Sequence, residues 1–186
     1  ADELRQMTQT PEGESDPKFS PDGAFVSFIR SQNIYVVNVK TGKEHRLTHD
    51  GAGLIRNGMA EYVAEEEMQR FTGYWWSPDS SRTDEAPVEE AQRYEIYPDT
   101  FKLNRQRFPR AGTPNVLVKL GVVKIKNRKT VWMDLGDNPD IYLARVNWLP
   151  DSRHLGFQRM SRDQKTLDLL IANTKNGNTR IALQET

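Results

Sequence analysis

Three consecutive glutamates, Glu65, Glu66 and Glu67, are the side chains of this sequence whose types and spacing could do chemistry. Like charges side by side repel each other, so such a run costs free energy unless water or a cation relieves it. An ammonium group carries one positive charge and three donors, and two carboxylates can bind it through charge-assisted hydrogen bonds. Consecutive helix residues diverge by about 100°, so three such side chains cannot all converge on one cation. The run alone fits either an amine-binding site or a solvated helix face.

The overall charge excludes several classes of function. The chain has 186 residues, with 26 basic and 26 acidic side chains and a net charge of zero. A general nucleic-acid binder or a binder of acidic membranes would show a basic excess. The sequence contains no cysteine, which excludes disulfides, thiol nucleophiles and thiolate metal sites. No apolar run approaches the roughly 20 residues of a membrane helix, and the polar start is neither a signal peptide nor a transit peptide.

Two other charged stretches are expected to be structural. Asp134, Asp137 and Asp140 lack the ligand spacing of an EF-hand loop and fit a connecting loop. The basic run Lys124–Lys129 has no interleaved aromatic residues and fits a polar hairpin turn. We therefore predict no metal, no cofactor and no nucleic-acid partner.

A loose repeat indicates the elements that position the glutamates. Two full copies cover Phe19–Thr48 and Val146–Leu183, and Trp75–Arg82 opens a third copy. Each begins with an aromatic residue and a Pro-Asp turn, and the full copies continue with short apolar strands joined by Gly-containing hairpin turns. A small antiparallel sheet of this kind cannot bury both faces alone, so neighbouring sheets must stack. We predict an all-β fold, a partial β-propeller of stacked four-stranded antiparallel blades, in which residues 1–186 form one domain of about four blades.

Two segments interrupt the repeat. Residues 57–73 have helical composition and predict a short inserted acidic helix, and residues 93–115, rich in proline and aromatic residues, predict an extended hairpin arm. In the third copy no apolar strand follows the turn, so we expect residues to be missing near Arg82 and Thr83. Trp75 and Trp76 are expected to pack within a blade.

Four motifs resemble the amino-terminal propeller domain of the dipeptidyl peptidase IV family, serine exopeptidases of the prolyl oligopeptidase clan, and are most similar to bacterial members. They are GMAEYVAEEEMQRFTGYWWSPD, RYEIYPD, RFPRAGTPNVLVKLGVV and DIYLARVNWLPDSRHLGFQRMSRDQKTLDLL. In that family a glutamate pair on an inserted helix binds the free α-amino group of the peptide substrate. The resemblance places this role on Glu66 and Glu67, with Glu65 as the lesser candidate.

The resemblance also implies a parent protein that releases dipeptides from peptide amino termini and is periplasmic or secreted. Its Ser, Asp and His triad would lie in a carboxy-terminal α/β-hydrolase domain that this sequence does not contain. No Gly-x-Ser-x-Gly elbow is present, and His45, His49 and His154 lie in strand or turn segments. We expect the chain alone to be catalytically inactive.

The predicted arm implies that the partner is a second copy of the same protein. In the family the corresponding segment helps to form a homodimer, and Tyr94, Tyr97, Phe101 and Phe108 would give it apolar surface to bury.

Two alternatives remain open. The chain could be a non-catalytic propeller-type module whose acidic helix docks a basic protein segment, or part of a family member that has lost its nucleophile and acts as a scaffold.

Overall fold

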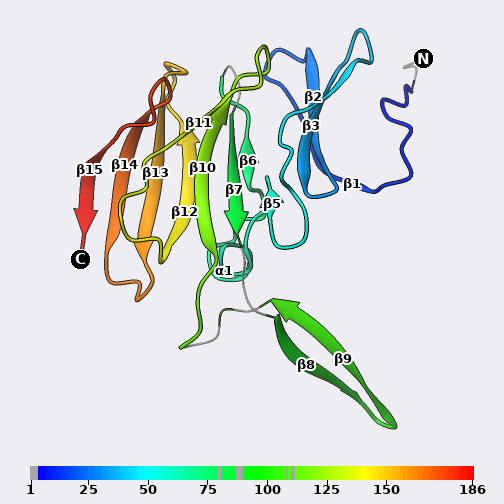
Figure 1. Ribbon diagram of the computed structural model, residues 1–186, viewed down its shortest axis with the longest axis vertical. Helices are drawn as coiled ribbons and strands as arrows, with labels where there is room; N and C mark the ends of the chain where they lie inside the picture. The colour runs from blue at the N-terminus through cyan, green and yellow to red at the C-terminus, as the bar shows by residue number, and fades with distance from the viewer. Residues whose placement is uncertain (1–3, 79–80, 87–89, 108, 110–111) are drawn as a thin grey trace.

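The computed structural model describes residues 4–78, 81–86, 90–107, 109 and 112–186. These residues form an all-β, partial β-propeller with one short helix. Two antiparallel sheets have four strands, a third has five, and a separate two-stranded sheet makes an extended arm. Figure 1 shows the three larger sheets standing next to one another with their strands roughly parallel to the long axis.

The first full copy of the repeat forms a four-stranded sheet. Its strands are β1 (Glu14–Phe19), β2 (Phe25–Arg30), β3 (Asn33–Asn38) and β4 (Glu44–Arg46), in that spatial order. The Pro-Asp turn joins β1 to β2, where Asp22 Oδ1 accepts from the Ala24 N–H over 3.0 Å. The sheet therefore begins one strand before the repeated motif, because the motif marks the first turn of each sheet and not its first strand.

The second full copy forms the sheet at the other end of the chain. Its strands are β12 (Ile141–Trp148), β13 (His154–Ser161), β14 (Leu167–Asn173) and β15 (Thr179–Glu185), again in sequence order. The turn before β13 repeats the chemistry of the first sheet, since Asp151 Oδ1 accepts from the Arg153 N–H over 2.9 Å. The same topology in both copies confirms the repeat.

The second sheet lies between these two and is less regular. It contains β5 (Arg56–Asn57), β6 (Tyr74–Trp75), β7 (Ser81–Ala86), β10 (Leu117–Val123) and β11 (Thr130–Trp132). β7 pairs with β10 on one side and with β5 and β6 on the other. The polar segment that includes Arg82 and Thr83 is thus itself a strand, and the expectation that residues are missing there stays a prediction. Backbone pairing on both sides can hold a strand that lacks an apolar face.

The arm consists of β8 (Glu90–Tyr97) and β9 (Thr100–Arg107), which pair over their whole length. Figure 1 shows this hairpin extending away from the three sheets. Chain length predicted about four blades, whereas the described residues form three sheets of blade size. The arm and the segments on either side of it take up the length that a further sheet would need.

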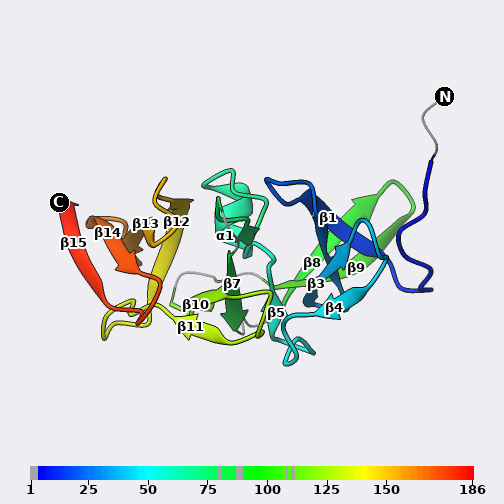
Figure 2. The ribbon, with the colours of Figure 1, turned by 90° about the horizontal axis from the view of Figure 1, so that it is seen from above.

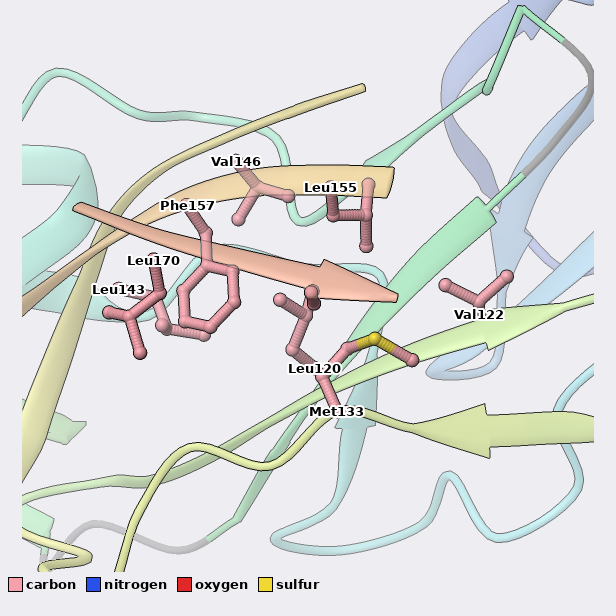
Figure 3. Close-up of a cluster of buried hydrophobic side chains, with 9 residues drawn as sticks. Leu120, Val122, Met133, Leu143, Val146, Leu155, Phe157 and Leu170 are labelled. Carbon is pink, nitrogen blue, oxygen red and sulfur yellow. The ribbon is translucent and has the colours of Figure 1, made fainter. Parts of the chain in front are cut away.

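The three sheets form an arc when they are seen from above (Figure 2), with β4, β11 and β15 toward its outer side. The second and third sheets are joined by a hydrophobic cluster, which we call the junction (Figure 3). The junction consists of Leu120, Val122, Met133, Leu143, Val146, Leu155, Phe157, Leu170 and Ala172. Trp75 and Trp148 are partly buried and pack against it. Apolar burial of about 25 cal/mol per Å² is therefore the main force that holds these two sheets together.

Candidate functional site

Residues 57–73, the insertion, form a loop that leaves the second sheet and returns to the same point. The Gly73 N–H donates to the Gly58 carbonyl over 3.0 Å, and Met59 and Thr72 form an isolated antiparallel bridge. Gly58 has a φ of +76°, and a Cβ at this position would lie 2.8 Å from Ile34 side-chain atoms. Glycine thus allows the chain to turn and to approach the first sheet at this neck.

The helix in the insertion is α1 (Tyr62–Glu66), which is shorter than the helical composition of the whole segment suggested. Its N-cap is Glu61, whose side chain is 5% exposed and accepts from the Val63 N–H over 2.6 Å and the Ala64 N–H over 2.8 Å. Two of the unpaired N–H groups at the helix start are satisfied in this way. Burial raises the pKa of Glu61, against the effects of these hydrogen bonds and of the nearby Arg70 charge.

The three glutamates of the run have different surroundings. Glu65 lies on α1 and is half-buried, whereas Glu66, the last helix residue, and Glu67, the C-cap, are exposed. Burial raises the pKa of Glu65, while the charges of Arg56 and Arg70 lower it. Glu65 therefore already lies in the field of two cations, and Glu66 and Glu67 form the accessible end of the helix.

Figure 2 shows α1 on the inner side of the arc, between β1 and β12. The helix packs against β12, the first strand of the third sheet. Tyr142 of β12 has a buried ring, and the Arg162 guanidinium carbon lies 5.9 Å from its centroid. Burial raises the pKa of Tyr142, Arg162 lowers it, and the charges of Glu61, Asp140 and Glu67 raise it. Glu67 thus contributes to the charge around the inner strand of the third sheet.

Sequence reasoning missed Glu61 and Arg70, which hold the helix in place. Arg70 is 7% exposed, and its Nε donates to the Leu143 carbonyl of β12 over 3.2 Å. Its guanidinium also lies 6.0 Å from the Trp75 ring. The sequence signal for Glu61 was an acidic residue directly before a helix, a favoured position near the helix dipole. No sequence signal identified the partner of Arg70, because Leu143 accepts through its backbone.

The other candidate residues lie away from α1 or serve packing. Trp75 packs against the junction, and Trp76 Nε1 donates to Ser27 Oγ over 2.8 Å, so both contribute to contacts between sheets. His154 Nδ1 lies 2.7 Å from Asp151 Oδ2 at the turn before β13. Asp134 Oδ1 accepts from the Gly136 N–H over 2.8 Å in the loop after β11.

Of the residues predicted for the arm, Tyr94 and Tyr97 lie on β8 and Phe101 lies on β9. Phe108 lies outside the described residues. Among the described residues, no group of three or more His, Asp or Glu side chains could hold a metal ion. The part of the chain that the structure describes also has no helix long and apolar enough to cross a membrane.

Stacked antiparallel sheets on an arc, with an acidic helix on the inner side, define the chain as part of a β-propeller. It belongs to the family described as the dipeptidyl peptidase IV (DPP IV) N-terminal region, whose model matches residues 1–186.

Individual relatives agree with this assignment. The chain is 27% identical over 198 residues to dipeptidyl peptidase 8 of Mus musculus, in a match that covers 88% of this chain and 22% of the relative. It is 28% identical over 179 residues to dipeptidyl peptidase 4 of Felis catus, covering 86% of this chain and 23% of that protein. This chain thus spans less than a quarter of the length of either relative.

The fold is also that of a solved structure. The crystal structure of Porphyromonas gingivalis dipeptidyl peptidase 4 matches with a TM-score of 0.86 and 24% sequence identity. The match covers 97% of this chain and 27% of that one.

Proposed function

We propose that this chain is the substrate-binding propeller part of a dipeptidyl peptidase IV-like serine exopeptidase, in which Glu66 and Glu67 bind the α-amino group of the peptide. The observation that carries the proposal is the position of α1 on the inner side of the arc (Figure 2), with both carboxylates exposed at its end. The surroundings of Glu65 explain why it is the lesser candidate, since Arg56 and Arg70 already offset its charge.

The chemistry of such an anchor is simple. A peptide ammonium relieves the repulsion between two neighbouring carboxylates and donates to both through charge-assisted hydrogen bonds. An extended residue spans about 3.3–3.6 Å, so an amine held at a fixed distance from a nucleophile selects the second peptide bond. The nucleophile, with its Asp and His partners, would lie in a hydrolase domain of the same parent chain, and positioning of the amine supplies the selectivity for dipeptides.

The test uses the full-length protein, with a chromogenic dipeptidyl substrate and its des-amino analogue. We expect the double variant Glu66→Gln and Glu67→Gln to lose about 100-fold or more in kcat/KM for the free-amine substrate, since hydrogen bonds to charged groups contribute about 1.5–3 kcal/mol each. The des-amino analogue should be cleaved at the same rate by both enzymes.

The matched control is Glu65→Gln, which removes a charge from the same helix and should leave the preference for the free amine intact. An unchanged preference in the double variant would reject the amine-binding role. The reading frame after Thr186 separates this function from the binding-module alternative, because the peptidase requires a Gly-x-Ser-x-Gly elbow there.

We also propose that the arm formed by β8 and β9 takes part in a homodimer, through the aromatic residues Tyr94, Tyr97, Phe101 and Phe108. The extension of the hairpin away from the sheets (Figure 1) supports this role, because such a strand pair needs a second surface to bury its side chains. A periplasmic or secreted location of the parent stays a prediction.

A further inference from the structure

A line of polar contacts crosses the inner side of the arc from β1 to β12 through the insertion. At the β1 end, Lys18 Nζ lies 2.7 Å from Asp16 Oδ2 and donates to Thr72 Oγ1. Thr72 Oγ1 in turn donates to Asp16 Oδ2 over 2.7 Å. The three side chains form a closed ring of contacts between the first sheet and the stem of the insertion.

The backbone of β1 is irregular where it meets the insertion. The pairing register between β1 and β2 shifts between Ser15 and Lys18, and Asp16 has a φ of +50°. A non-glycine residue in the left-handed region costs free energy and persists when surrounding contacts compensate for it. At Asp16 those contacts are the ones to Lys18 and Thr72.

The line continues from Thr72 to the third sheet through Arg70. Arg70 Nη1 donates to the Thr72 carbonyl over 3.0 Å, and its Nε donates to the Leu143 carbonyl of β12 over 3.2 Å. The backbone N–H of Arg70 donates to the Ala64 carbonyl of α1 over 2.8 Å. Thr72 therefore contacts β1 with its side chain and, through its carbonyl and Arg70, is connected to both β12 and α1.

These contacts are directional and partly buried, since the side chains of Lys18 and Asp16 are 25% and 31% exposed. Lys18 Nζ also donates to the Tyr74 carbonyl over 2.8 Å and lies 3.6 Å from the centroid of the Tyr74 ring. Hydrogen bonds in such surroundings are strong, and a partner left without its bond is costly. The neck of the insertion is closed independently by the Gly58–Gly73 hydrogen bond, so the loop can form without the side-chain contacts of Thr72.

We propose that Thr72 is a positioning residue, which holds α1 at a fixed place between the first and third sheets and thereby aims Glu66 and Glu67 at the substrate amine. This role rests on the amine-binding function proposed above. A shift of about 1 Å in a positioned group can cost about 100-fold in rate, so the hydroxyl of Thr72 affects peptide selection although it touches no substrate.

The test is Thr72→Val in the full-length protein, which removes the hydroxyl and retains the shape of the side chain. We expect kcat/KM for a free-amine dipeptidyl substrate to fall about 10- to 100-fold, mainly through KM, while the des-amino analogue is cleaved as before. Thr72→Ser restores the hydroxyl and should restore the preference for the free amine. The control Thr174→Val removes another threonine hydroxyl, which donates to the Arg153 carbonyl away from α1, and should change neither substrate.

A second variant keeps the test decisive if Thr72→Val does not fold. Asp16→Asn removes the acceptor charge, and asparagine tolerates the left-handed backbone at this position. An equal loss for both substrates, or no loss for either, in the folded variant would overturn the positioning role.

The double variant at Glu66 and Glu67 separates the failure of this proposal from the failure of the amine-binding function. If the double variant loses the preference for the free amine while Thr72→Val and Asp16→Asn retain it, only the positioning role fails. If the double variant also retains it, the amine-binding function fails.

Discussion

The junction and the insertion are stabilised by different kinds of interaction. The junction buries nine apolar side chains between the second and third sheets (Figure 3), and none of its contacts requires a particular hydrogen bond. The insertion has a short helix with a buried carboxylate at its start, and a chain of polar contacts fixes its position. Apolar burial is not directional, so it secures the arc of sheets, whereas hydrogen bonds fix the direction in which a side chain points.

The comparison shows where stability and function reside in this chain. A change in the junction should lower the free energy of unfolding of the sheets and leave the direction of the glutamates unaffected until the fold is lost. A change at an exposed position of the insertion, such as Glu66 or Glu67, should alter ligand binding with little change in stability. Each prediction below tests one side of this contrast.

The largest expected effect is Phe157→Ala in the junction. The Phe157 side chain is 1% exposed, and its removal should lower the free energy of unfolding by about 3–5 kcal/mol through lost burial and the cavity that remains. Urea unfolding followed by tryptophan fluorescence measures the change. The matched variant in the insertion is Glu66→Gln, an exposed position where the change should stay within about 0.5 kcal/mol. Equal losses in the two variants would contradict the contrast.

A smaller effect is expected at the neck of the insertion. Gly58→Ala places a Cβ 2.8 Å from Ile34, which is fully buried, and keeps a left-handed backbone that costs about 1–2 kcal/mol for a non-glycine residue. Gly23→Ala is the control, since its φ is +70° and a Cβ there meets nothing within 4 Å. The Gly58 variant should therefore be the less stable of the two in the same urea assay. A Gly23 variant that is equally unstable would show that steric contact with Ile34 is unimportant.

The sequence was sufficient to predict the repeated sheets and the hairpin arm. Their signals are local, since Pro-Asp turns, Gly-containing hairpins and short apolar strands each specify structure within a few residues. The strand β7 was missed because Ser81–Ala86 is polar, and its pairing depends on β5, β6 and β10, which are distant in sequence. The pairing register between strands that are distant in sequence leaves no local pattern in the residues of either strand.

The candidate site was predictable only in part, for a related reason. Glu66 and Glu67 were chosen as candidates because three adjacent carboxylates are unusual and because the surrounding motif resembles a known family. Thr72 and Arg70, which connect the insertion to β1 and β12, were not found, because threonine and arginine are common and their partners are a side chain on β1 and a backbone carbonyl on β12. A contact to a backbone carbonyl can be made with any residue type, so sequence alone does not reveal it.

The smallest expected effect is a change in pH dependence at the helix cap. Burial raises the pKa of Glu61 above its ordinary value of 4.5. The folded protein therefore retains this proton to a higher pH than the unfolded chain does. The contribution of the group to stability is complete below pH 4.5 and is lost as the pH rises through the raised pKa.

Glu61→Gln keeps an acceptor for the helix N–H groups but cannot titrate, so above pH 4.5 its stability should fall less with rising pH than that of the original chain. Urea midpoints measured across pH provide the comparison. Asp151→Asn in the third sheet is the control of opposite sign, because the hydrogen bond from His154 lowers the pKa of Asp151 to about 2. The stability that Asp151 contributes is present above its ordinary pKa of 3.8 and is lost as the pH falls toward about 2. Asp151→Asn should therefore be less stable than the unsubstituted protein above pH 3.8, and the difference should shrink only in acid. If the stability of Glu61→Gln and that of the unsubstituted protein change equally with pH, burial does not raise the pKa of Glu61 and this prediction is wrong.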